Sequence, residues 1–246
     1  MKRRLTTIVF TLCAVSAIAE RDVGSGPEPA SCRPAARFMT APWWTSRLAA
    51  TRGAILKNKG ACFDLVLVGD SITHRWESRD NGAEVYPKLR KSFKVLNLGN
   101  GGDMTQNVIW RFENNGELDD YTAKVFAIMI GVNNGAKDPD GTVAGVRKIV
   151  GMIRAKHPES KILLQAILPH GKEPRNSVSA KTINPKLKAY AEASGFAWLD
   201  MGEKFLGDDG EIKPGLMMPD NLHPIKGGYE IWLAQLVPAV EKLIGK

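Results

Sequence analysis

Residues 63–71 read Phe-Asp-Leu-Val-Leu-Val-Gly-Asp-Ser, a short apolar run that is closed by a glycine and followed by two polar residues. Leucine and valine dominate the run, and β-branched side chains favour extended backbone because they pack well on a pleated surface. The apolar residues are continuous rather than alternating, which indicates a strand covered on both faces. The pattern therefore predicts a buried strand over residues 63–68, with Ser71 just past its end.

Apolar runs of the same character recur along the chain, at residues 94–98, 124–130, 161–167 and 196–199. Helical spacing of apolar residues marks the segments around them, at residues 43–59, 104–113, 142–157, 180–194 and 228–244. Buried strands that alternate with amphipathic helices form parallel sheets covered on both faces. We therefore predict an α/β fold over residues 43–246, a three-layer α/β/α sandwich with a five-stranded, mainly parallel sheet.

Polar segments follow the predicted strands at their carboxyl ends. Glycine-rich segments at residues 69–71, 99–103 and 131–134 follow the first three strands that lie along the chain, and residues 220–223 form a polar cluster before the last helix. In open parallel sheets the working residues gather at the carboxyl ends of the strands. The sequence predicts a functional site built from these four segments.

Ser71 is the candidate nucleophile of this site. A serine hydroxyl is a weak nucleophile unless a base lies beside it. A serine directly after a strand also commonly caps a helix, so on its own Ser71 leaves both interpretations open. The G-x-S-x-G elbow, the P-loop, the H-E-x-x-H pattern and the dinucleotide-binding G-x-G-x-x-G pattern are all absent from the chain.

Only one of the four histidines has a carboxylate close before it in the sequence. His223 follows Asp220 by three residues, and such a carboxylate can hold an imidazole in one tautomer and stabilise its protonated form. The alternative is a plain turn before the last helix. His157 is predicted to be a charged residue at a helix end, and His74 and His170 follow the first and fourth strands.

If Ser71 attacks a carbonyl group, the site also needs hydrogen-bond donors for the oxyanion that develops. Two segments offer such donors. Glycine at position 102 lets a ligand approach the backbone N–H, and the spacing of Asp103 and Gln106 predicts a capping box that would place Gly102 at a helix N-terminus. Asn133 follows a glycine and could supply a side-chain N–H. The alternatives are a glycine turn without a ligand at residue 102 and a left-handed turn residue at Asn133.

These segments, in this order, resemble the four blocks of the SGNH (GDSL-type) hydrolases. The resemblance implies a flavodoxin-like fold and a serine esterase, with catalytic Ser71, Asp220 and His223 and an oxyanion hole formed by Ser71, Gly102 and Asn133. It covers the chain from about Phe63 to the C-terminus and implies no metal and no cofactor.

Residues 98–118 are similar, more narrowly, to the catalytic subunits of platelet-activating-factor acetylhydrolase Ib. This branch implies a small acyl group and hints at a homodimer. Asn134 stands where many SGNH hydrolases have aspartate, but the same branch also has asparagine there. Trp43 and Trp44 lie outside the family blocks and are expected either to pack the N-terminal segment against the core or to form a lip that stacks on sugars.

The first residues have the pattern of a secretory signal peptide. Three basic residues precede an apolar run that ends in Ala17-Ile18-Ala19, which predicts cleavage after Ala19 and a secreted or periplasmic enzyme. Residues 20–42 are rich in Pro, Gly, Ser and Ala and are predicted to be an extended arm. Cys32 and Cys62 remain after cleavage, and an oxidising compartment would allow them to pair, although two free thiols are equally consistent with the sequence.

Composition limits the partners. The formal net charge is +8, but the basic residues are scattered, so nucleic-acid binding is not expected. No stable membrane insertion is expected after cleavage of the signal peptide. The sequence favours an exported esterase that removes short-chain, most readily acetyl, groups from a small-molecule or glycan ester, above all a carbohydrate. The alternatives are a lipid or phospholipid acyl esterase and a non-catalytic glycan-binding protein on the same scaffold.

Overall fold

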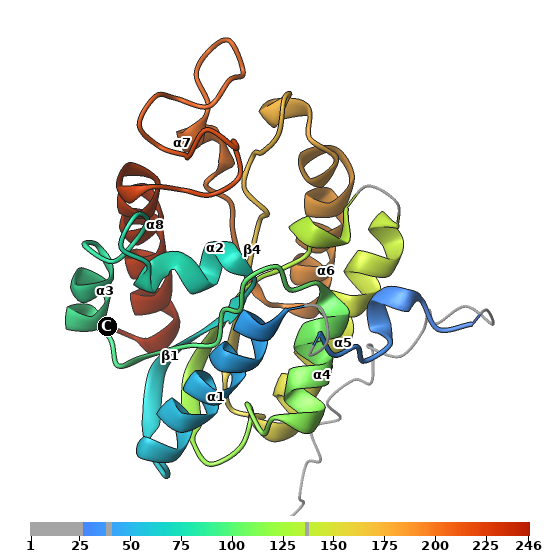
Figure 1. Ribbon diagram of the computed structural model, residues 1–246, viewed down its shortest axis with the longest axis vertical. Coiled ribbons are helices and arrows are strands. Elements are labelled where there is room, and N and C mark those ends of the chain that lie inside the picture. Colours follow the sequence, from blue (N-terminus) through green and yellow to red (C-terminus); the bar gives the residue numbers. More distant parts are fainter. Residues whose placement is uncertain (1–26, 38–40, 136–137) are drawn as a thin grey trace, which may run out of the picture.

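A computed structural model describes residues 27–37, 41–135 and 138–246, so the predicted signal peptide lies outside the described residues. Five parallel strands form one sheet in the order β2-β1-β3-β4-β5 (Figure 1). The strands are β1 (Cys62–Gly69), β2 (Val95–Asn97), β3 (Thr122–Met129), β4 (Lys161–Gln165) and β5 (Ala197–Leu199). The predicted α/β class and five-stranded parallel sheet are confirmed.

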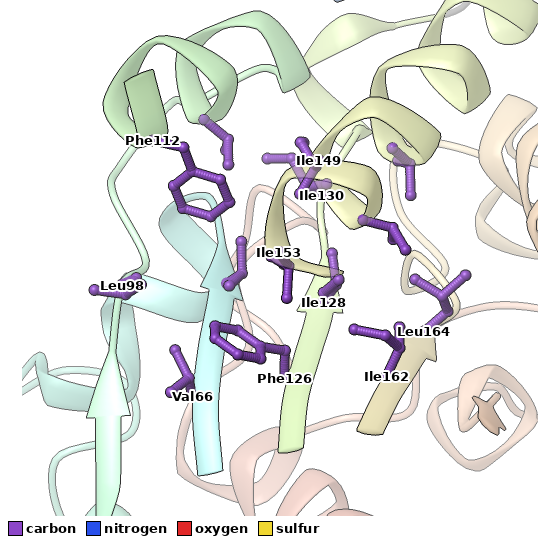
Figure 2. Close-up of a cluster of buried hydrophobic side chains, with 14 of the residues drawn as sticks. Val66, Leu98, Phe112, Phe126, Ile128, Ile130, Ile149, Ile153, Ile162 and Leu164 are labelled. Atoms are coloured by element: carbon purple, nitrogen blue, oxygen red, sulfur yellow. The ribbon is translucent and has the colours of Figure 1, made fainter. Parts of the chain in front are cut away.

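Side chains alternate between the two faces of this sheet. Val66 of β1 and Phe126 of β3 point to one face, while Leu65 and Val125 belong to a second core on the other. Figure 2 shows the first core, in which Phe126, Ile128 and Ile162 from the strands meet residues such as Phe112 and Ile153 from the helices. Burial on both faces explains why the strands read as continuous apolar runs.

Helices cover both faces of the sheet. Apolar residues of α1, α4, α5 and α6 join the first core, and residues of α2, α3, α7 and α8 join the second. The helices are α1 (Pro42–Lys57), α2 (Ser71–His74), α3 (Tyr86–Ser92), α4 (Thr105–Asn114), α5 (Pro139–Lys156), α6 (Asn184–Ser194), α7 (Gly202–Phe205) and α8 (Lys226–Ile244). The sequence pattern predicted the five longest of these to within a few residues at each end.

Several local predictions are wrong. The segment predicted as a helix from residue 180 begins instead as a π-helical turn (Ser179–Ile183), and α6 follows it. The short helices α2, α3 and α7 escaped prediction because they are too short to show an apolar period. The capping box of Asp103 and Gln106 does not form, since α4 begins at Thr105 and the side chain of Asn107 accepts the N–H of Met104 at 2.9 Å.

The N-terminal arm is not extended throughout. Ala30–Cys32 form a 3₁₀ turn, and the described part of the arm packs on α4 and α5, beside which it runs in Figure 1. The hydroxyl of Thr105 donates to the carbonyl of Ser31 at 2.7 Å, and the side chain of Asn107 donates to the carbonyl of Ala35 at 2.8 Å. The arm is therefore held against the start of α4.

The two cysteines of the described chain are both free. Cys32 is buried in the arm, whereas Cys62 is exposed at the start of β1. The disulfide that the sequence left open is not formed. Among residues 27–37, 41–135 and 138–246, no helix is both long and apolar enough to span a bilayer.

Candidate active site

Ser71 lies directly past the end of the central strand β1, where it is the first residue of α2. Asp70, and not Ser71, is the cap of that helix, because its carboxylate accepts the N–H of Ile72 at 2.9 Å. A Cβ at Gly69 would collide with the Thr73 side chain and the Met129 carbonyl, so glycine alone permits this tight strand-to-helix turn. The turn frees the Ser71 hydroxyl from helix capping and presents it at the edge of the sheet.

His223 and Asp220 extend from Ser71 as a chain of hydrogen bonds. The Ser71 Oγ lies 2.9 Å from His223 Nε2, and His223 Nδ1 lies 2.6 Å from Asp220 Oδ2. The other oxygen of Asp220 accepts the backbone N–H groups of Leu222 and His223, at 2.9 and 3.0 Å. The structure thus brings together three groups that the sequence places up to 152 residues apart.

The charge of Asp220 suits this arrangement. Partial burial opposes its ionisation, but the hydrogen bonds from the His223 side chain and from the two backbone N–H groups outweigh burial and lower the pKa of the carboxyl. An ionised Asp220 accepts a hydrogen bond from the Nδ1–H of His223. In that tautomer Nε2 carries no proton, so it can accept a hydrogen bond from the Ser71 hydroxyl. Ser71 is therefore placed to lose its proton to His223.

Gly102 and Asn133 lie past the ends of the strands that flank β1 in the sheet. Gly102 follows β2 and has a φ of +68°, a left-handed conformation that favours glycine. Asn133 follows β3, and its side chain donates to the carbonyl of Asp103 at 2.9 Å. That bond uses one of the two donors of the amide and ties the Asn133 side chain to the loop of Gly102.

A buried ion network lies beneath the Gly102 loop, and sequence reasoning missed it. Asp103 accepts the indole N–H of Trp44 at 2.5 Å and the Arg111 Nε at 2.8 Å, and Arg111 also pairs with Glu117. The Thr51 hydroxyl donates to Glu117 at 2.9 Å. Buried charges leave no periodic signal in a sequence, so only the paired tryptophans and the arginine inside an amphipathic helix could have hinted at it.

The network has two carboxylates for one guanidinium. Burial raises the pKa of Asp103 to about 6, even though Arg111 and the Trp44 N–H favour its ionised form. The two carboxylates in turn raise the pKa of Arg111 against the effect of burial. Arg111 therefore stays charged and holds Asp103, and with it the backbone of Gly102, in one position.

Asn134 joins the arm to α4. Its Oδ1 accepts the N–H of Thr105 at 3.0 Å, and its Nδ2 lies 3.0 to 3.2 Å from oxygens of Ser31, Thr105 and Gln106. An aspartate here would present an oxygen to these side chains instead of a donor. This explains why asparagine suits a chain that packs its arm on this corner of the site.

The other three histidines have structural environments. His157 is not the charged helix end that was predicted: it is buried between Tyr121 and Phe126, its Nε2 lies 3.0 Å from the carbonyl of Leu118, and burial lowers its pKa. His170 Nε2 lies 3.0 Å from the Ser179 hydroxyl. Burial, together with nearby arginines, lowers the pKa of His74 to about 4, so it is neutral.

Asp70 provides a pH-dependent prediction. Burial raises its pKa to about 7, and the charge of Asp103 adds to the shift, while the N–H of Ile72 opposes it. An acid whose pKa is raised on folding stabilises the fold below its unfolded pKa and loses that contribution as pH rises toward 7. We compare the free energy of unfolding of Asp70→Asn with that of wild type. The variant's value minus the wild-type value should increase by about 2–3 kcal/mol between pH 5 and pH 8.

Urea unfolding at several pH values measures this difference. The control is Asp64→Asn. The ammonium group of Lys124 and the backbone N–H of Lys94 both donate to Asp64, and together they outweigh burial and lower its pKa. The difference in free energy of unfolding between Asp64→Asn and wild type is expected to stay constant over the same pH range. A constant difference for Asp70→Asn would mean that Asp70 is already ionised at pH 5.

Comparison with known proteins places this geometry in a family. Residues 67–231 match the model of the GDSL-like lipase/acylhydrolase family, a span that includes Ser71, Gly102, Asn133, Asp220 and His223. The chain belongs to the GDSL-like lipase/acylhydrolase family. The predicted SGNH placement is confirmed, and with it the prediction that the chain is an ester hydrolase.

Individual relatives of this GDSL-type hydrolase include the alpha2 subunits of platelet-activating factor acetylhydrolase IB from Rattus norvegicus and Homo sapiens. Each is 32% identical over 169 residues, which cover 68% of this chain and 71% of the relative. A GDSL-like lipase from Bacteroides thetaiotaomicron has a similar fold, with a TM-score of 0.60, 22% identity, and coverage of 84% of this chain and 99% of that structure. An acetyl xylan esterase from Geobacillus stearothermophilus has a TM-score of 0.57 at 19% identity, covering 74% and 96%.

Proposed function

We propose that Ser71, His223 and Asp220 form the catalytic triad of an esterase that removes acetyl groups from carbohydrates. The observation that carries the proposal is the hydrogen-bonded chain from Ser71 Oγ through the His223 ring to Asp220, at 2.9 and 2.6 Å. A serine becomes a nucleophile when a base oriented by a carboxylate lies within hydrogen-bond reach.

The mechanism has two halves. His223 Nε2 takes the proton of Ser71 as the Oγ attacks the ester carbonyl, and Asp220 stabilises the imidazolium that forms. The backbone N–H groups of Ser71 and Gly102 and the free donor of Asn133 bind the oxyanion. His223 then gives its proton to the departing alcohol, and a water molecule, activated by the same base, releases acetate from the acyl-enzyme and restores the Ser71 hydroxyl.

A short acyl group agrees with the surface of the molecule. In the part of the chain that the structure describes, the exposed large hydrophobic side chains are Trp43 and Leu56, so the outer surface offers little exposed apolar area to a long acyl chain. The names of two similar proteins, an acetylhydrolase and an acetyl xylan esterase, also point to acetyl. The second of these names favours a carbohydrate as the alcohol.

A phospholipid or other lipid ester is the second candidate substrate, favoured by the name of the platelet-activating factor acetylhydrolase subunits. Acetate release from acetylated xylo-oligosaccharides, measured beside release from an acetylated phospholipid, separates the two. A higher kcat/KM with the phospholipid would overturn the carbohydrate assignment. Failure of a fluorophosphonate to label Ser71 would instead favour a glycan-binding protein without turnover.

Export forms part of the same proposal. It rests on the basic start, the apolar run and the Ala17-Ile18-Ala19 site at the N-terminus. Acetylated polysaccharides are too large to enter a cell, so an exported enzyme would meet them. The homodimer implied by the resemblance stays a prediction.

If Asn133 binds the oxyanion, removing its side chain should lower kcat selectively. Asn133→Ala should lower kcat by roughly 10²–10³-fold and leave KM nearly unchanged, because the second donor of the amide is used only when charge develops on the carbonyl oxygen. Steady-state kinetics with a soluble acetyl ester measures both constants. Asn114→Ala, at an exposed asparagine near the end of α4, is the control and should match wild type. An unchanged kcat in Asn133→Ala would remove this residue from the oxyanion hole.

A further inference from the structure

Two adjacent tryptophans of α1 lie in opposite environments. Trp44 is fully buried and donates to Asp103, whereas Trp43 is 50% exposed. A large aromatic side chain gains much by burial, so an exposed tryptophan on a rigid helix suggests a surface that is kept for a ligand. Because Trp44 is fixed in the core, the backbone that presents Trp43 is fixed as well.

Trp43 stands on the loop that holds the proposed oxyanion donor. A Cβ built on Gly101 would lie 3.2 Å from Cζ3 of Trp43, and one built on Gly102 would lie 3.3 Å from its Cη2. The indole edge therefore lies close over both glycines, and a side chain at either position would press against it. Besides backbone conformation, the nearby indole is a second reason why positions 101 and 102 are glycine. It also places an exposed aromatic surface at the rim of the proposed active site.

Arg37 adds a charged group to the same rim. Its guanidinium donates to the carbonyl of Gly102, and its Cζ lies 5.5 Å from the centroid of the Trp43 ring. A guanidinium carries five N–H donors, so the bond to Gly102 leaves donors for a ligand beside the indole. The cation–π contact also holds the two side chains together.

We propose that Trp43 and Arg37 form the subsite for the sugar ring that carries the ester. This inference rests on the proposed function. An acetyl group is only two carbons long, so most of an acetylated sugar has to lie on the rim around Ser71. One face of a pyranose ring presents C–H groups that stack on an indole, while its hydroxyl groups accept from a guanidinium. An alkyl chain would contact the indole alone and would offer no acceptor to the arginine donors.

Two substrates test the proposal. For acetylated xylotetraose, Trp43→Ala should lower kcat/KM roughly tenfold, chiefly through KM, while kcat/KM for methyl acetate, which has no ring to stack, should stay within about twofold of wild type. Trp43→Phe should restore most of the loss because it keeps an aromatic face. Leu56→Ala is the matched control: Leu56 is 49% exposed on the same helix and should affect neither substrate.

Binding to an inactive enzyme gives a readout that does not depend on turnover. In the Ser71→Ala background, calorimetry should show about tenfold weaker binding of acetylated xylotetraose when Trp43 is also replaced by alanine. Equal losses of kcat/KM on both substrates would mean that Trp43 only supports the oxyanion loop, and no loss on the oligosaccharide would remove the subsite. Either result overturns this inference alone. If wild-type enzyme hydrolyses methyl acetate but not the oligosaccharide, the carbohydrate part of the proposed function fails.

Discussion

Replacing Ser71 with alanine should lower kcat for acetyl ester hydrolysis by roughly 10⁴–10⁶-fold, the loss expected when the nucleophile of a triad is removed. The fold should be retained, because the hydroxyl contacts His223 and the cap of α2 is provided by Asp70. Rates with p-nitrophenyl acetate and labelling by a fluorophosphonate measure the effect, and circular dichroism with thermal unfolding checks the fold.

A second serine–histidine pair in the chain gives a matched control. Ser179 Oγ lies 3.0 Å from His170 Nε2, nearly the spacing of Ser71 and His223, but Ser179 is buried in the π-helical turn. Ser179→Ala should therefore keep activity within about twofold of wild type. Retained hydrolysis in Ser71→Ala, or its loss in a well-folded Ser179→Ala, would show that the nucleophile has been misassigned.

Replacing Arg111 with methionine should be the most destabilising of these changes. The side chain is fully buried between Asp103 and Glu117, so its removal leaves two buried carboxylates without their cation. Breaking a buried ion pair in this way costs about 3–5 kcal/mol, which corresponds to a fall in Tm of roughly 10–15 °C for a chain of this size. Calorimetry or urea unfolding at neutral pH measures the loss.

The pH dependence of Arg111→Met distinguishes lost charge from lost packing. Burial already raises the pKa of Asp103, and losing the guanidinium removes the charge that opposes this rise. An acid whose pKa is raised by folding stabilises the fold at low pH and less so as pH rises. The loss in free energy of unfolding caused by Arg111→Met should therefore be smaller at pH 5 than at pH 8. Adding Glu117→Gln should restore part of the lost stability. A deficit independent of pH would point to packing alone.

A surface ion pair provides the comparison for Arg111. Lys88 lies 3.7 Å from Glu230, and both side chains are exposed. Such pairs contribute little because water screens them, so Lys88→Met should change stability by less than about 0.5 kcal/mol. A large effect at Lys88 would mean that burial is not what makes the Arg111 network important.

The main elements of this protein follow from local patterns. The run at residues 63–68, its repeats and the helical spacing between them predict the strand-and-helix order, because a strand buried on both faces has to be apolar throughout. Once the strands are parallel, their carboxyl ends share one edge, so Ser71, Gly102 and Asn133 come to the same region. The short spacing of Asp220 and His223 predicts their contact, since a side chain reaches three residues along a turn.

Tertiary structure alone decided how the groups behave once burial and distant partners act on them. His157 was predicted to be charged, yet packing between Tyr121 and Phe126 disfavours its cation. Trp43 and Trp44 are adjacent and chemically identical, but one is buried against Asp103 and the other stands exposed over the Gly101–Gly102 turn. Periodicity reports which face of an element is apolar, whereas the state of a charge or an aromatic ring depends on desolvation and on residues far away in the chain.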